Sequence, residues 1–136
     1  MNEAIAELRA LLQKPQAGLR LVHLHLGRLE NPAIIDRKAI RGILRDLGKR
    51  AAAWRLFDIA NGDLIMLYQG VEYAAAEQIC RDIAARLAET RLIGACPYPD
   101  EVSTAGPEGP LYHIFDLAQN IGLVRRYLET VKPAAG

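Results

Sequence analysis

Residues 54–70 read WRLFDIANGDLIMLYQG, and this stretch decides the fold that the sequence predicts. Trp54, Leu56 and Asp58 alternate with Arg55, Phe57 and Ile59, and a second apolar run follows from Leu64 to Tyr68. Between these runs stands the pair Asn61-Gly62. A type I′ turn needs φ > 0 at both of its central residues, and Asn-Gly is the pair that meets this need best. The stretch therefore predicts a β-hairpin closed by a type I′ turn.

The composition indicates one domain over residues 1–136. The chain is 51% apolar and 24% charged, which is ordinary for a globular protein. Seventeen basic residues against sixteen acidic ones leave a net charge of +1, so charge favours neither nucleic acid nor a membrane as partner. No apolar run approaches the ~18 residues of a membrane span. The N-terminus lacks the pattern of a signal peptide, and two cysteines are too few for a disulfide framework, so we expect a cytoplasmic protein.

Three elements are predicted before the hairpin. Apolar residues at helical spacing predict a helix within residues 1–15, which Pro15 stops. An almost wholly aliphatic run predicts a central strand at 19–26, covered on at least one face. Asp36 is then a plausible N-cap for a helix whose apolar stripe ends near Gly48.

Four segments follow the hairpin. A second long helix is predicted over 71–90, with Cys80 inside its apolar stripe as a buried, unreactive thiol. Residues 91–110 contain four prolines and three glycines and are expected to form a long irregular loop. A short strand at 111–115 and a C-terminal helix over 117–132 complete the chain.

The element order is therefore helix, β-α-β-β-α-β, helix. Right-handed crossovers place the two long helices on one side of the sheet. This predicts an α+β, ferredoxin-like βαββαβ sandwich over residues 18–116, with an extra helix at each end. The usual strand order of that fold puts the first strand between the hairpin's second strand and the last strand.

The turn Asn61-Gly62-Asp63-Leu64-Ile65, between the two predicted strands, resembles the GGDEF motif of diguanylate cyclase domains. The segment His25-Leu26-Gly27-Arg28-Leu29-Glu30 stands where those domains carry an Asp-x-Asp-x-Phe-Lys-like sequence. The resemblance covers about residues 19–87 and implies a bacterial domain of cyclic-di-GMP signalling. Arg55 and Asp58 also have the spacing of that family's product-binding motif, but on a strand they face opposite sides of the sheet.

The chain departs from this family at the residues that carry its chemistry. Such cyclases hold two metal ions with carboxylates, which the developing phosphate charge requires. Here His25 replaces an acidic residue of the first strand, Leu64 replaces the glutamate of the turn, and Asn61 replaces its first glycine. Asp63 alone would not hold two Mg²⁺ ions, and it also suits a turn-capping role. We therefore expect a degenerate domain that is not an enzyme.

The histidines form a second constellation. His23 and His25 are two residues apart on a predicted strand, so they share a face, and His113 lies in the strand expected beside it. If His113 shares that face, the three imidazoles would suit Zn²⁺ or another borderline metal. The alternative is a set of half-buried histidines that hydrogen-bond their neighbours.

The favoured function is a non-catalytic regulatory or protein-interaction module, without a cofactor. Its expected partners are a second copy or a neighbouring domain, with the terminal helix (Ile5, Leu8, Leu12) and the loop 91–110 as candidate surfaces. One alternative is a nucleotide- or metal-binding phosphotransfer site at His25, Asn61, Gly62 and Asp63. Another is a small-ligand sensor whose pocket is the histidine face.

Overall fold

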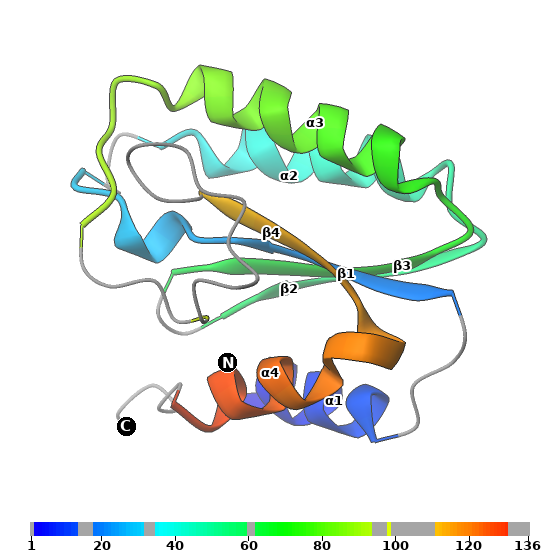
Figure 1. Cartoon of the computed structure of the whole chain (residues 1–136). Coiled ribbons are helices and arrows are strands. Elements are labelled where there is room, and N and C mark those ends of the chain that lie inside the picture. The colour runs from blue at the N-terminus through cyan, green and yellow to red at the C-terminus, as the bar shows by residue number, and fades with distance from the viewer. Residues whose placement is uncertain are drawn as a thin grey trace.

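The computed structural model contains a four-stranded antiparallel sheet in the order β2-β3-β1-β4 (Figure 1). The structure describes residues 2–13, 18–31, 35–59, 62–93, 98 and 111–130. Its strands are β1 (Leu19–Leu24), β2 (Ala53–Asp58), β3 (Leu64–Gln69) and β4 (Tyr112–Asp116). The first strand lies between β3 and β4, as predicted, so the ferredoxin-like α+β fold is confirmed.

Helices cover both faces of this sheet. Helices α2 (Arg37–Gly48) and α3 (Tyr73–Arg86) lie on one face, while α1 (Asn2–Leu12) and α4 (Leu117–Thr130) lie on the other (Figure 1). The predicted helices are thus confirmed, although α3 is shorter than the 71–90 expected. The predicted strand 19–26 ends at Leu24, and a 3₁₀ turn, η1 (Leu26–Arg28), follows it. No helix among the described residues is long and apolar enough to cross a membrane.

Alternation along β1 divides the core into two layers. Leu21 faces α1 and α4, whereas Val22 and Leu24 face α2 and α3. Both sets are fully or almost fully buried. A strand that is apolar on both sides is the expected result of covering both faces of a sheet, because each side chain then meets a helix layer. The prediction of a central strand from its aliphatic composition is therefore confirmed.

The hairpin is present, but its predicted type I′ turn is wrong. The Ile59 N–H donates to the Asp63 carbonyl, and the Gly62 N–H donates back to the Ile59 carbonyl. A two-residue Asn61-Gly62 loop would instead pair residue 60 with Asp63. Gly62 has a φ of +97°, which suits the left-handed residue that closes a three-residue hairpin loop. The observed register sets Phe57 beside Ile65, and both side chains are buried on the α1/α4 face.

Described parts of the two surfaces proposed for partner contact are buried within the domain. Leu8 and Leu12 of α1 are 0% exposed and pack into the domain's own core, so they are not available to a partner. The side chain of Ile5 lies outside the described residues. Of the loop 91–110, the structure describes 91–93 and Tyr98, and the Tyr98 side chain is also buried.

The helix on the opposite face begins as predicted. The Asp36 carboxylate accepts a hydrogen bond from the Ala39 N–H, so Asp36 is the N-cap of α2. Helix α2 ends at Gly48, also as predicted. Cys80 of α3 is buried in the core layer between the sheet and helices α2 and α3. Burial raises the pKa of its thiol to about 12. The prediction of a buried Cys80 is confirmed, and its raised pKa favours the unreactive thiol that the sequence predicts.

Candidate functional site

The face of the sheet that α1 and α4 cover contains a cluster of buried polar side chains. His23 projects from β1, where its backbone stands directly opposite His113 of β4. His25 follows the end of β1, and its ring centroid lies 4.0 Å from that of His23. All three histidines are at most 2% exposed. They share one face, as predicted, but they are fully buried rather than half-buried.

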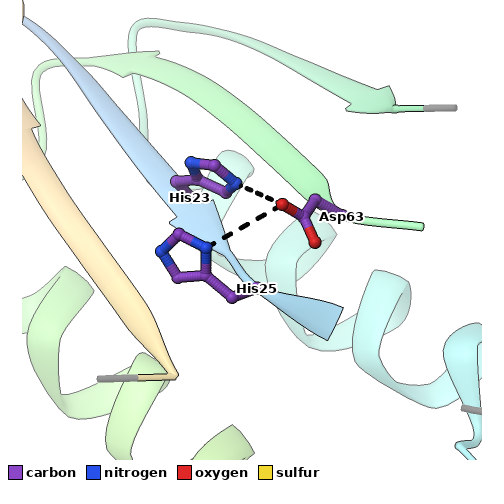
Figure 2. A group of neighbouring side chains, drawn as sticks. All are labelled: His23, His25 and Asp63. Carbon is purple, nitrogen blue, oxygen red and sulfur yellow. Dashed lines mark hydrogen bonds and ion pairs between the residues drawn. The ribbon is translucent and has the colours of Figure 1, made fainter. Parts of the chain in front are cut away.

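Asp63 joins this cluster from the hairpin turn. Because β1 and β3 are antiparallel, the end of β1 meets the start of β3, and Asp63 immediately precedes Leu64 there. Figure 2 shows its carboxylate directed at His23 and His25. The Asp63 Oδ2 atom lies 2.7 Å from His23 Nε2 and 3.8 Å from His25 Nδ1.

Two further hydrogen bonds hold the Asp63 carboxylate. The Tyr127 hydroxyl of α4 donates to Oδ2 at 2.8 Å, and the Gly27 N–H donates to Oδ1 at 2.9 Å. Asp63 is 2% exposed. Its described contacts thus reach β1, η1 and α4, so Asp63 links segments well beyond the turn in which it lies.

The histidine rings also contact Tyr98 and one another through their other nitrogens. His23 Nδ1 lies 2.8 Å from the Tyr98 hydroxyl, and His25 Nε2 lies 2.7 Å from His113 Nδ1. The remaining His25 nitrogen, Nδ1, is buried and has no hydrogen-bond partner among the described residues. An unpaired polar atom in a buried site is costly in free energy, so this nitrogen needs an explanation.

Burial dominates the electrostatics of the cluster. It lowers the pKa of His23 and of His25, and lowers that of His113 to about 4, with the nearby Arg28 charge acting in the same direction. Burial alone would raise the pKa of Asp63, but the hydrogen bonds from His23, Tyr127 and Gly27 outweigh it and hold that pKa below its usual value. Near neutral pH the site is an ionised carboxylate among neutral imidazoles.

The predicted ligand-binding residues are only partly brought together. His25 and Asp63 meet, as described above. Gly62 lies close to them in the chain, and its carbonyl accepts a hydrogen bond from Arg37 of α2. A Cβ on Gly62 would stand 3.1 Å from the Gly27 Cα, so the turn packs tightly against the segment after β1. Asn61 lies outside the described residues.

The predicted three-histidine metal site is corrected in its membership. His23, His25 and Asp63 each offer a ligand atom, and these atoms all lie within 4.8 Å of one another. His113 instead contacts the far nitrogen of His25. Sequence reasoning placed Asp63 with His25 in one candidate site, and His25 with His23 and His113 in another. It did not join Asp63 to His23, and it did not single out Tyr98 or Tyr127. The antiparallel β1–β3 pairing was the available signal for Asp63, whereas the tyrosines had none.

An open pocket on the histidine face, as a small-ligand sensor would use, does not match this burial. Two described hollows of about 170 Å³ lie elsewhere. One is lined by residues of α1 and of β1, β2 and β3, including Leu11 and Trp54. The other is lined by residues of α1 and α4, including Arg9 and Arg125.

No family model, no curated protein and no solved structure matches the chain.

Proposed function

We propose that this chain is a non-catalytic regulatory module, similar to a degenerate diguanylate cyclase domain, that acts through contact with a second copy or a neighbouring domain in the cytoplasm. The observation that carries this proposal is the inward direction of Asp63. Asp63 is the acidic residue that the chain retains in its GGDEF-like turn. A carboxylate that is to hold a nucleotide's metal ion must reach an open surface.

Asp63 is not available for that role in this fold. It is 2% exposed, and both of its oxygens already accept hydrogen bonds from the protein. Breaking such bonds to a buried carboxylate costs about 1.5–3 kcal/mol each. Turning Asp63 outward to a nucleotide at the surface would break these bonds and oppose the folding of the surrounding cluster, which supports a role without phosphotransfer chemistry.

The product-binding motif of that family also lacks support. Arg55 forms an ion pair with Glu7 of α1, whereas Asp58 forms one with Arg41 of α2. Helices α1 and α2 cover opposite faces of the sheet (Figure 1). The ion pairs of Arg55 and Asp58 therefore lie on opposite faces. A ligand would have no common surface on which to contact both residues, so we expect no cyclic-di-GMP binding through this pair.

The proposal predicts that the purified chain does not convert GTP. Incubation with GTP and either Mg²⁺ or Mn²⁺, followed by chromatography of the nucleotides, should give no cyclic-di-GMP or pyrophosphate above a protein-free reaction. An active diguanylate cyclase serves as the positive control. Titration calorimetry with GTP and with cyclic-di-GMP should give no binding heat. Sedimentation velocity over a range of protein concentrations measures whether the chain associates with a second copy of itself.

Product formation that disappears in Asp63→Asn but persists in Asp58→Asn would overturn the proposal. The two substitutions make the same chemical change, but Asp58 is an exposed carboxylate on β2 and lies outside the cluster. This pair therefore separates a true phosphotransfer site from a contaminating activity.

A further inference from the structure

We infer that His23, His25 and Asp63 form a buried binding site for a divalent transition-metal ion, with His23 Nε2, His25 Nδ1 and Asp63 Oδ2 as ligand atoms. This inference goes beyond the proposed regulatory role and does not depend on it. It also differs from a site of three histidines, because a carboxylate replaces His113.

The positions of the three atoms suit one ion. Ligands 2.0–2.1 Å from zinc in tetrahedral geometry are roughly 3.3 Å apart. The Asp63 Oδ2 atom lies 2.7 Å from His23 Nε2 and 3.8 Å from His25 Nδ1, which brackets that spacing. Figure 2 shows both imidazoles directed at this one oxygen. All three ligand atoms lie within 4.8 Å of one another, so the side chains stand close enough to share one ion.

The unpartnered His25 nitrogen points to a cation. When His25 Nε2 carries the proton and donates to His113 Nδ1, the Nδ1 atom of the neutral ring presents a lone pair. This lone pair faces the Asp63 carboxylate, so two acceptors stand opposite one another with no proton between them. A metal ion bound to both satisfies the buried nitrogen and balances the buried carboxylate charge.

His23 reaches the ion by a change of tautomer. Its Nε2 atom lies against Asp63, and its Nδ1 atom lies 2.8 Å from the Tyr98 hydroxyl. On metal binding the ring keeps its single proton, which moves from Nε2 to Nδ1 and is donated to the Tyr98 oxygen. The Nε2 lone pair is then free for the ion. The ring therefore releases no proton overall.

Outer contacts hold each ligand in place. Tyr98 holds the His23 ring, His113 holds the His25 ring, and Gly27 and Tyr127 hold the Asp63 carboxylate. Such contacts orient the ligands of metal sites, and their loss typically lowers metal affinity by about 10–100-fold. Each of the three ligand residues therefore has at least one neighbour that fixes its orientation, as in known metal sites.

The ligand set indicates the class of metal. Imidazole nitrogens suit Zn²⁺, Co²⁺, Ni²⁺ and Fe²⁺, whereas Mg²⁺ and Ca²⁺ prefer sets of oxygen atoms. Two imidazoles with one carboxylate also match the three protein ligands of many zinc sites that keep a fourth position open. We therefore expect binding of Zn²⁺ and Co²⁺ but not of Mg²⁺.

The test begins with the full chain, stripped with a chelator and incubated overnight with Zn²⁺. After dialysis, elemental analysis should find a single Zn²⁺ per chain. At a free concentration 100-fold above the dissociation constant, the thermal midpoint should rise by roughly 5–10 °C. Mg²⁺ at the same concentration should leave it unchanged. Asp63→Asn and His25→Gln should abolish the Zn²⁺ shift, whereas Asp58→Asn should retain it.

Nitrogen NMR of the wild-type histidine rings keeps the inference testable if the variants do not fold. Zn²⁺ should move the signals of His23 Nε2 and His25 Nδ1 to metal-bound positions and leave both His113 nitrogens unbound. Zn²⁺ that fails to remain after dialysis would overturn the inference. So would a zinc-bound His113, or a shift that Asp63→Asn retains. None of these results bears on GTP turnover, so the two proposals fail separately.

Discussion

Asp63 shows how one side chain organises a buried site. It accepts hydrogen bonds from an imidazole, a phenol and a backbone N–H that come from three different segments. A buried carboxylate is tolerated only when such donors replace water. The neighbouring histidines stay neutral because burial disfavours their charged form. The cluster therefore links the folding of this layer to proton concentration.

The metal-free protein should lose stability as the pH falls from about 7.5 to about 5.5. His113 has a pKa of about 4 in the fold, whereas an unfolded histidine titrates near 6.5. Between these values the unfolded state binds more protons. The free energy of unfolding therefore falls with decreasing pH, by at most about 1.4 kcal/mol per pH unit for this residue. The lowered pKa values of His23 and His25 act in the same direction.

Urea unfolding with a chelator present, at about pH 7.5, 6.5 and 5.5, measures this dependence. The variant His113→Gln should show a shallower pH dependence than the wild type, because one of the three titrating imidazoles is gone. A free energy of unfolding that stays constant over this range would contradict the expected neutral state of the buried rings. The lowered pKa of Asp63 adds a further loss only at more acidic pH.

Among the secondary-structure elements, α2 has some features that its local sequence determines and one that tertiary packing determines. Its N-cap and apolar stripe follow from local rules, and both are present in the structure. Glycine at the last residue, Gly48, is explained by a tertiary contact. A Cβ at this position would lie 2.4 Å from the Trp54 ring of β2, so glycine allows the helix end to approach the hairpin. Gly42, within the same helix, has no such neighbour.

These two glycines should respond oppositely to alanine. Gly48→Ala should lower the free energy of unfolding by about 1–3 kcal/mol, because the added methyl group forces the Trp54 ring to move. Gly42→Ala should raise it by about 0.4–1 kcal/mol, because alanine restricts the unfolded chain and fits the helix without a clash. Chemical denaturation of both variants under one set of conditions checks the contrast. Equal effects would show that the Trp54 contact does not limit this position.

For the molecule as a whole, the terminal helices matter as much as the ferredoxin-like core. Helices α1 and α4 close the sheet face that carries the histidines and Asp63 (Figure 1). Tyr127 of α4 reaches the site directly, and the Arg9 side chain of α1 donates to the Leu128 carbonyl of α4. Without this layer, the polar cluster would stand in water and would lose the burial that sets its protonation.

Alanine at Leu8 should therefore destabilise the entire domain. Leu8 is 0% exposed in the layer between α1 and the sheet, so its truncation should cost about 2–5 kcal/mol. Leu11, in the same helix and 38% exposed, is the matched control and should change stability by about 0.5 kcal/mol or less. Urea denaturation measures both. A cost at Leu8 as small as that at Leu11 would mean that α1 is not part of the folded core.

Local patterns were enough to predict the elements and the order of the strands. Helical spacing, alternation and capping act over a few residues, so the hairpin, the central strand and the long helices could be read in order. Right-handed crossovers then left one arrangement of the sheet. The resemblance to a cyclase and the regulatory role that it implies remain predictions, since they depend on few residues.

The site required contacts that no local pattern contains. Asp63 lies 40 residues from His23 in the chain, Tyr98 lies 75 residues from it, and Tyr127 lies 64 residues from Asp63. The register of the hairpin turn also differs by one residue from the predicted turn, and such a shift reverses the face that each side chain takes. Local chemistry therefore determined the elements, whereas only their packing brought one carboxylate and two imidazoles to a common point.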